Sequence, residues 1–393
     1  MSSKIIFFIH TVNISAKPQQ ILSVSRAWNN MGYKVFMFTP WEIVKNLNEP
    51  IKIIKIPTIG KGHLRSFCFG LALIFILPIF AFIYKPIMIY SRQIYLESIP
   101  IFILKKILRT KYVLNINGWR LAENKEWRKN YFNYRNYVEI FYKLSYKLAD
   151  YIVSVTKGIS NAIVETYNFP PENILTIGNG VNLDFFKPIP QENAQKFLNL
   201  STDYIYLFFA GSFKIWHGLD FGLRVLSELL KKERNLKLII CGSSKLDPIN
   251  INEKNAKDYI DKEKLNDFII FTGFIDPSKL HLYINASTIC LTFHPNLEMM
   301  KFGLSPLKIP EYMACKKPIV CTDVGGLGEL IEHQYKCGLA AKAGNIQDYV
   351  SKVLYLLHNK EIRDNLAENG YKIAVEQLEW NKIAQKILNF VKI

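Results

Sequence analysis

The sequence predicts an α/β fold made of two doubly wound, Rossmann-like domains. Short apolar segments alternate with helical segments from end to end, which is typical of parallel sheets covered by helices. A chain of 393 residues is too long for one ordinary core and favours two. The alternating series also restarts near residue 200, after residues 185–190 and a polar stretch. We therefore predict an N-terminal domain at 1–187 and a C-terminal domain at 188–376.

Apolar runs of strand length, bounded by polar or turn residues, define the expected elements. In the N-terminal domain we expect strands at 4–9, 34–38, 51–56, 87–90, 112–116, 151–155 and 174–177, and helices near 18–31, 66–83, 95–109, 127–149 and 158–167. In the C-terminal domain we expect strands at 205–210, 236–241, 268–272, 288–292 and 318–322, and helices at 219–232, 277–286, 307–315, 345–358 and 360–376. Strand and helix in strict alternation predict parallel sheets.

The uncharged run at 66–84 is just long enough to cross a bilayer. Gly70 and Pro78 interrupt it, and a strand-like segment follows directly. A spanning helix would also put the first strands and the rest of the domain on opposite sides of the membrane. We therefore favour a helix that covers the sheet, leave a monotopic membrane contact open, and consider a span the weakest of the three.

Net charge is +17, and between Lys105 and Lys157 twelve Lys and Arg face only four Asp and Glu. Such a basic surface suits nucleic acid, anionic lipid or phosphorylated substrates. No zinc-finger, RNP or helix-turn-helix pattern accompanies it, so we predict no nucleic-acid partner and favour lipid or a lipid-phosphate acceptor. The aromatic, basic helix at 127–149 fits a surface that rests on lipid, or equally a core-facing helix with a solvated basic side.

Six cysteines are scattered without CxxC pairs or His partners, which favours reduced thiols in a cytosolic fold over a metal site or a disulfide framework. The apolar N-terminal run at 4–9 is too short for a signal peptide and is expected to be the first strand.

Residues 302–329 are the most informative stretch of the chain. A Gly/Ser/Pro loop at 302–306 leads into a helix, and this arrangement aims unpaired backbone N–H groups at one point, which suits a phosphate. Lys308 can neutralise charge there, and Glu311, on the first turn, can hold sugar hydroxyls. A glycine-rich turn and a second helix start at Glu329 follow a short apolar strand.

This stretch resembles the nucleotide-sugar signature of family 4 glycosyltransferases of the group 1 type, which are retaining enzymes of the GT-B fold. That fold has two Rossmann-like domains facing a central cleft. The matching residues are Ser305–Lys308, Glu311–Ala314, Lys317–Pro318 and Thr322–Gly326. Five further blocks match in order, at 149–158, 179–188, 211–218, 271–275 and 377–380. The resemblance implies that residues 377–393 form a closing helix that returns to the N-terminal domain.

The resemblance implies a donor site in the C-terminal domain. Glu311 matches the glutamate that holds the ribose hydroxyls, and the turn at Phe274 matches the one whose backbone grips the base. The loop at 211–218 would supply Gly211, Ser212 and His217 toward the diphosphate, although a packed loop histidine is the alternative for His217.

This chain departs from the family pattern at three of these positions. An arginine and a lysine common in the family loop are replaced by Ser212 and His217. Lys214 and Lys308 are the substitutes that we expect to stabilise the leaving diphosphate, with a solvated surface lysine as the alternative for each. The family's first glutamate falls on Gly303. Backbone N–H groups of Gly303, Leu304 and Ser305 are the expected replacement.

The acceptor side is less informative. Asn117 occupies the place where many relatives have a histidine that contacts the donor sugar, and we group it with Lys308 and Lys214 as catalytic candidates. Arg92 and Arg120 are candidates for an acceptor phosphate, with a structural salt bridge as the alternative for each. No Asp-x-Asp motif is present, so we expect no metal and no cofactor beyond the nucleotide-sugar substrate.

The resemblance therefore implies retaining transfer of a sugar from a nucleotide diphosphate donor to a lipid-linked or growing glycan acceptor. We expect a cytoplasmic protein in peripheral contact with the anionic inner face of a membrane. The alternatives are transfer to a small soluble acceptor, and a non-catalytic subunit that has kept the fold.

Overall fold

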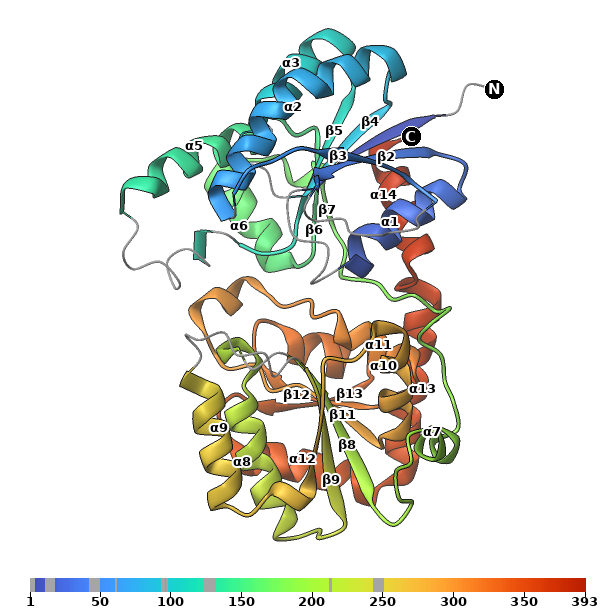
Figure 1. The fold of residues 1–393 in the computed structure, drawn as a ribbon. Coiled ribbons are helices and arrows are strands. Elements are labelled where there is room, and N and C mark those ends of the chain that lie inside the picture. Colours follow the sequence, from blue (N-terminus) through green and yellow to red (C-terminus); the bar gives the residue numbers. More distant parts are fainter. Residues whose placement is uncertain are drawn as a thin grey trace. The chain divides into compact units, whose positions relative to one another are not determined.

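A computed structural model describes residues 4–10, 18–41, 50–60, 62–92, 96, 98–119, 121–122, 132–211, 214–242 and 251–393. The chain forms two compact units (Figure 1). Unit 1 comprises Met1–Gly178 and Trp380–Ile393, and unit 2 comprises Asn179–Glu379. Each unit is a parallel sheet with helices on both faces, so the predicted α/β class with two doubly wound domains is confirmed.

The sheet of unit 1 has the strand order β3-β2-β1-β4-β5-β6-β7, and every described pair is parallel. Its strands are β1 (Ile5–His10), β2 (Lys34–Pro40), β3 (Lys52–Ile56), β4 (Met88–Arg92), β5 (Lys111–Ile116), β6 (Tyr151–Ser154) and β7 (Ile174–Thr176). Its helices are α1 (Pro18–Asn30), α2 (Gly62–Tyr84), α3 (Ser98–Leu108), α5 (Phe132–Leu148), α6 (Lys157–Tyr167) and α14 (Trp380–Val391). All seven strands predicted for this half are present within two residues of their expected ends.

The last helix, α14, packs against the first helix of the chain. In Figure 1, red α14 lies beside blue α1. The indole N–H of Trp28 donates to the carbonyl of Ala384 over 3.1 Å, and the ammonium of Lys111 donates to the carbonyl of Val391 over 2.6 Å. The inward side of α14 is fully apolar, with Ile383, Ala384, Ile387, Leu388 and Val391 buried.

The sheet of unit 2 has the order β10-β9-β8-β11-β12-β13. Its strands are β8 (Ile205–Ala210), β9 (Leu236–Cys241), β10 (Ile269–Gly273), β11 (Ile289–Leu291), β12 (Ile319–Asp323) and β13 (Gly338–Lys342). Its helices are α7 (Gln191–Phe197), α8 (Leu219–Leu230), α9 (Ile251–Lys262), α10 (Pro277–Ala286), α11 (Lys308–Ala314), α12 (Ile346–His358) and α13 (Lys360–Gln377). A π-helical turn at Glu329–Gln334 replaces the regular helix that we predicted to start at Glu329.

Two helices and one strand of unit 2 escaped the sequence prediction. Helices α7 and α9 are rich in polar residues, and β13 consists of Gly-Leu-Ala-Ala-Lys, which has no β-branched residue. Small residues are needed at the start of β13, because a Cβ on Gly338 would lie 2.0 Å from the carbonyl oxygen of Ile319 on β12.

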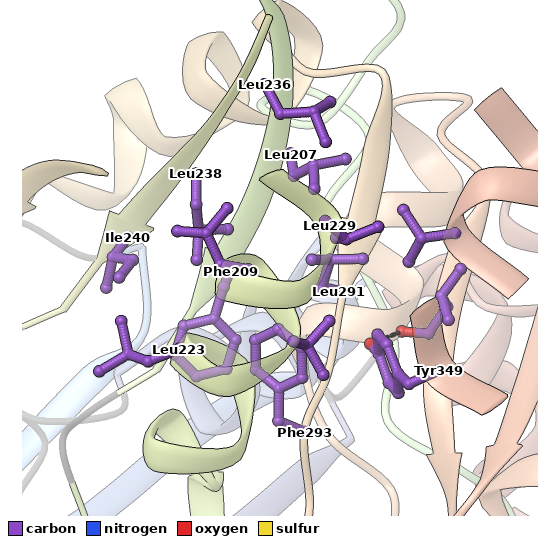
Figure 2. Packing of buried hydrophobic residues seen from close by; sticks show 14 of the residues in the cluster. Leu207, Phe209, Leu223, Leu229, Leu236, Leu238, Ile240, Leu291, Phe293 and Tyr349 are labelled. Carbon is purple, nitrogen blue, oxygen red and sulfur yellow. Dashed lines mark hydrogen bonds between the residues drawn. The ribbon is translucent and has the colours of Figure 1, made fainter. Parts of the chain in front are cut away.

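Unit 2 has an apolar core on each face of its sheet. On the α8 and α12 side, Phe209, Leu223, Phe293 and Tyr349 interlock with leucines of three strands (Figure 2). The buried hydroxyl of Tyr349 donates to the carbonyl of Val320 over 2.7 Å. On the other face, the buried residues of α11 pack with residues of β8 and β12.

The units divide between Gly178 and Asn179 and again between Glu379 and Trp380, whereas we predicted boundaries after 187 and 376. The segment at 179–187, which we predicted to end the N-terminal domain, belongs to unit 2 because its backbone and its buried side chains contact that unit. The N–H of Val181 donates to the carbonyl of Leu378 over 2.8 Å, and Val181 and Phe186 are buried in the core of unit 2.

Helix α2 connects two strands that belong to one sheet. It follows β3 and precedes β4, and β4 pairs with β1 in register from Ile6↔Met88 to His10↔Arg92. A membrane span through α2 would separate β1 from β4, so the spanning alternative is wrong for this fold. Among the described residues, the stretch Leu64–Tyr84 is long and apolar enough to cross a membrane, but by length and composition only.

Candidate active site

The candidate site of unit 2 lies where the strand order of its sheet reverses. From β8 the chain continues outward to β9 and β10, and β11 then returns to pair on the other side of β8. In open parallel sheets, ligands bind outside the carboxyl ends of the strands at such a switch point. The segments that leave the carboxyl ends of β8 and β11 are residues 211–218 and 292–307, which contain most of the predicted donor-binding residues.

The segment after β8 is tied to the segment after β11. It forms a 3₁₀ turn at Ile215–His217 and ends at Gly218, where φ is +65°. A Cβ at Gly218 would lie 1.8 Å from the carbonyl oxygen of Phe293, so only glycine allows this approach. One residue further on, Nδ1 of His294 lies 2.8 Å from the carbonyl oxygen of Trp216.

His294 is a site residue that sequence reasoning missed. Its side chain is only 4% exposed, and burial, with the charge of Lys308 as a second cause, lowers its pKa to about 3. The ring is therefore neutral near pH 7, and Nδ1 donates its proton to the Trp216 carbonyl. The hydroxyl of Thr322 donates to the carbonyl of His294 over 2.7 Å and fixes its backbone. Its position two residues after the predicted strand at 288–292 was the available signal.

The glycine loop before α11 is closed by a second glycine turn. Gly303 has φ +102°, and the N–H of Leu304 donates to the carbonyl of Gly325 over 3.2 Å. Gly325 itself has φ +59°, and a Cβ there would lie 2.4 Å from the carbonyl oxygen of Met300. The two glycine-rich stretches of the predicted motif therefore meet in space, and there is no room for a side chain at Gly325.

Ser305 already has a partner within the protein. Its hydroxyl accepts a hydrogen bond from the N–H of Asn179 over 2.9 Å, and its carbonyl accepts one from the amide side chain of Asn179. The predicted linker signature at 179–182 is thus bound directly to the predicted donor motif. The hydroxyl of Ser305 serves this junction, and a donor-binding role for Ser305 stays a prediction that concerns its backbone.

Helix α11 holds the two charged residues of the motif in a buried position. Lys308 is 8% exposed and Glu311 is 9% exposed. The Nζ of Lys308 lies 4.8 Å from the ring centroid of Phe209, at the end of β8. Burial raises the pKa of Glu311 to about 8, and the nearby charge of Lys308 opposes this shift. A carboxyl group that can donate or accept, next to a cation, suits hydroxyl and phosphate groups of a ligand.

The switch point thus assembles Gly211, His217, His294, Lys308 and Glu311. A Cβ on Gly211 would lie 3.2 Å from the ring of His217, and the rings of His217 and His294 are 5.9 Å apart. Lys214 is exposed, with its Nζ 4.7 Å from the ring centroid of Trp216. Ser212 lies outside the described residues.

Phe274 follows β10, two strands away from β8 at the same edge of the sheet. Its side chain is 74% exposed, and the preceding Gly273 has φ +66°. The N–H of Gly242 donates to the carbonyl of Gly273 over 3.0 Å, which joins this turn to the end of β9. Glu298 and Glu329, which flank the motif in the sequence, are solvated: Glu329 is exposed, and Glu298 forms a surface ion pair with Lys301.

In unit 1, two of the predicted residues lie at the carboxyl edge of the sheet. Arg92 ends β4 and is paired in register with His10 of β1 and Asn115 of β5, at the switch point of this sheet. Asn117 follows β5, and its buried side-chain oxygen has no hydrogen-bond partner in the described part of the protein. Arg120 lies outside the described residues. The described ranges contain no cluster of three or more His, Cys, Asp or Glu that could hold a metal.

Two family models match the chain in succession. The model of "Glycosyltransferase Family 4" matches residues 19–185, and the model of "Glycosyl transferases group 1" matches residues 190–373. Together they cover most of both units, each on its own domain.

Similar curated proteins are glycosyltransferases. An uncharacterized glycosyltransferase of Methanocaldococcus jannaschii is 24% identical over 253 residues, 62% of this chain and 60% of that protein. The N,N'-diacetylbacillosaminyl-diphospho-undecaprenol alpha-1,3-N-acetylgalactosaminyltransferase of Campylobacter jejuni is 28% identical over 264 residues, 64% of this chain and 62% of that protein. The match therefore spans about three fifths of the length of these relatives.

Solved structures with the same fold cover nearly the whole chain. Sucrose-phosphate synthase from Thermosynechococcus elongatus aligns over 99% of this chain and 98% of its own, with a TM-score of 0.79 and 16% identity. HepE of Anabaena, solved in complex with UDP-glucose, aligns over 99% of both chains, with a TM-score of 0.72 and 15% identity. At this identity the likeness establishes the fold, which is GT-B.

Proposed function

The chain belongs to the group 1 glycosyltransferases, and from this premise we propose that it transfers a sugar, with retention, from a nucleoside diphosphate to a lipid-linked or growing glycan acceptor. The observation that carries the proposal is the buried pair Lys308 and Glu311 at the switch point of unit 2. A lysine and a carboxyl group held out of water need a structural or functional reason, and both match the nucleotide-sugar motif.

Each residue of the pair has a distinct role in the proposed reaction. Glu311 receives the ribose hydroxyls, and its raised pKa lets it bind them as a neutral or a charged group. Lys308 stabilises the negative charge that develops on the diphosphate as it leaves, and its low exposure strengthens this effect because water screens it little. Lys214 and the backbone of the 303–305 loop complete the diphosphate site, and the turn at Phe274 receives the base.

Retention follows from attack on the same face as the departing phosphate, which is the usual proposal for this family. In that mechanism no protein carboxylate acts as a nucleophile. Glu311 on α11, the one buried carboxyl group among the described residues of this site, is assigned to the ribose, which is consistent with this route. We propose that the diphosphate is neutralised by lysines and backbone N–H groups and that no divalent metal is required.

The acceptor binds to unit 1 in this proposal. Arg92 stands at the switch point of that sheet, where a phosphate of the acceptor would be expected to bind. The name of the Campylobacter jejuni relative states an undecaprenol diphosphate-linked acceptor, and this supports a lipid diphosphate as the class of acceptor. Such acceptors lie at a membrane, so we propose that the protein is cytoplasmic and peripheral on the inner membrane face.

The proposal is tested by binding and transfer with a panel of UDP-, GDP-, ADP-, CMP- and dTDP-sugars, with and without magnesium. We expect one base to raise the apparent Tm, independently of magnesium, and the matching sugar to be transferred with its anomeric configuration kept, as read by NMR of the product. Binding without transfer to any lipid-linked acceptor would point to the non-catalytic alternative. Binding that requires magnesium would contradict the metal-free site.

Substitution of Glu311 tests the site itself. Glu311→Ala should weaken binding of the nucleotide about tenfold or more, because a hydrogen bond to a charged group such as a carboxylate contributes roughly 1.5–3 kcal/mol. The control is Glu298→Ala, which removes an exposed carboxylate from the same connection between β11 and α11. Equal affinities of the two variants would refute the assignment of the ribose to Glu311.

A further inference from the structure

Helix α2 exposes an apolar stripe along its whole length. Its large outward side chains are 41–72% exposed. From Leu64 to Phe82 they recur every three or four residues, and Ile83 follows Ile79 by four, so they share one face; they are Leu64, Phe67, Leu71, Phe75, Ile79, Phe82 and Ile83. The opposite stripe, made of Phe69, Leu73, Leu77 and Ala81, is completely buried in unit 1. A helix that covers a sheet normally has a polar outer face. Here both faces are apolar, and such exposed patches mark interaction sites.

The neighbouring helix adds to the exposed apolar surface. Helix α3 packs against α2, as Figure 1 also shows, and it exposes Phe102 and Ile107. The Nζ of Lys106 lies 4.6 Å from the ring centroid of Phe102, so a cation is placed directly on an exposed aromatic ring. Arg109 follows on the same segment and is exposed. Aromatic rings next to cations are typical of surfaces that enter the headgroup region of a membrane.

The formal charge of the protein is carried entirely by the unit that contains this surface. Unit 1 has 26 Lys and Arg against nine Asp and Glu, which is +17, whereas unit 2 has 24 of each and is neutral. From residue 50 to residue 122, which includes α2 and α3, there are eleven Lys and Arg and a single acidic residue, Glu97. This surface is therefore complementary to an anionic partner.

We infer that the outward stripe of α2 docks in the plane of an anionic lipid surface. The stripe would lie among the acyl chains, with the basic residues of unit 1 at the headgroups. A second copy of the chain is the weaker occupant, because pairing this face with itself would bring two units of +17 together. The helix lies in the plane rather than across it, because its other stripe is buried in unit 1 and both flanking strands, β3 and β4, are paired in the sheet of that unit.

This inference rests on the proposed peripheral location and names the surface responsible for it. It does not involve the donor site, so binding to lipid can be measured apart from transfer. The probe is a sedimentable vesicle of phosphatidylcholine with about one third phosphatidylglycerol, and the comparison is a vesicle of phosphatidylcholine alone. The full chain is used in every assay.

The test variant is Phe75→Asp/Phe82→Asp, since both rings are 72% exposed and their replacement leaves the core intact. We expect the wild type to sediment with the anionic vesicles, to bind at least tenfold more weakly to neutral ones, and to be released as salt is raised. The double variant should bind the anionic vesicles at least tenfold more weakly than the wild type. Its affinity for the nucleotide should be unchanged, which separates this inference from the proposed function.

The matched control is Phe185→Asp/Phe197→Asp, which introduces the same two charges at phenylalanines of unit 2 that are 42% and 70% exposed and should leave vesicle binding unchanged. The inference is overturned if the wild type does not bind anionic vesicles, or if the double variant binds them as well as the control does. It is equally overturned if the wild type is a dimer in solution, by light scattering, and the double variant is a monomer, because a second copy would then cover the stripe.

Discussion

At the residue scale, Glu311 combines a cost in stability with its proposed role in binding the nucleotide. Its ordinary pKa is 4.5, and burial raises it to about 8 in the folded protein. Between these two values the unfolded chain releases the proton that the folded unit retains. The stability of the unliganded protein should therefore fall as pH rises through this window, by about 1.4 kcal/mol for each pH unit. A binding site that keeps such a group accepts the cost in exchange for a buried polar contact with its ligand.

Glu311→Gln removes this titration and keeps the shape of the side chain. We expect the variant to have a higher apparent Tm than the wild type at pH 8 and a similar one at pH 4.5, while its affinity for the nucleotide is lower at both. Thermal unfolding at the two pH values gives the difference directly. A difference between variant and wild type that does not change with pH would mean that Glu311 ionises normally in the folded protein.

His294 should show the opposite sign. Its ordinary pKa is 6.5 and its folded value is about 3, so below pH 6.5 the unfolded chain binds a proton that the folded unit excludes. The wild type should therefore lose stability as pH falls from 6.5 toward 3. His294→Asn can still donate to the Trp216 carbonyl but cannot titrate, so this part of the acid sensitivity should disappear. An unchanged loss between pH 6.5 and 5 would contradict a neutral, buried His294.

At the scale of elements, the loop between β8 and α8 has its shape because of one close approach. Gly218 and Gly344 both have positive φ, but a Cβ at Gly218 would meet the carbonyl oxygen of Phe293 at 1.8 Å, whereas nothing lies within 4 Å of a Cβ at Gly344. Gly344→Ala should therefore cost only the conformational strain, about 1–2 kcal/mol. Gly218→Ala should cost several kcal/mol more, because backbone must move.

The comparison of the two glycine variants is made by thermal unfolding, with nucleotide affinity as the second measurement. Gly218→Ala should also weaken binding of the nucleotide, because it displaces the loop that contains Lys214 and His217. Gly344→Ala serves as the control for positive φ alone. Equal losses of stability in the two variants would show that the approach to Phe293 is not a constraint.

At the scale of the whole molecule, the chain enters unit 2 at Asn179 and returns to unit 1 at Trp380. Unit 1 is thus built from both ends of the chain, and the last helix should contribute strongly to its stability. Ile387 is 1% exposed, while its neighbour Lys386 is exposed. Ile387→Ala should destabilise unit 1 by about 2–5 kcal/mol, and Lys386→Ala by less than about 0.5 kcal/mol.

In calorimetry, Ile387→Ala should lower the midpoint of one unfolding transition, that of unit 1. If the two units unfold separately, the nucleotide should still raise the midpoint of the other transition, because the proposed donor site lies in unit 2. Similar transitions for the Ile387 and Lys386 variants would contradict the packing of α14 into unit 1.

Local chemistry was enough to predict much of this protein. The alternation of apolar strands and helices, the restart near residue 200 and the motif at 302–329 depend on residues close together in the chain. They predicted most strands of both sheets and singled out Lys308 and Glu311, which the fold buries in unit 2. Features that depend on contacts between distant residues could not be predicted from these local patterns. Helices α7 and α9 and strand β13 lack a strong local pattern, and β13 forms because β12 offers it an edge.

The same distinction holds for the site and its surroundings. The tertiary structure decided that Ser305 is bound by Asn179, that His294 is buried beside the 214–218 loop, and that Glu311 titrates near pH 8. It also decided that α2 cannot span a membrane, because β1 and β4 pair in one sheet, and that one apolar stripe of α2 remains exposed. Periodicity and motifs are properties of neighbouring residues, whereas burial and pKa depend on which distant residues the fold brings together.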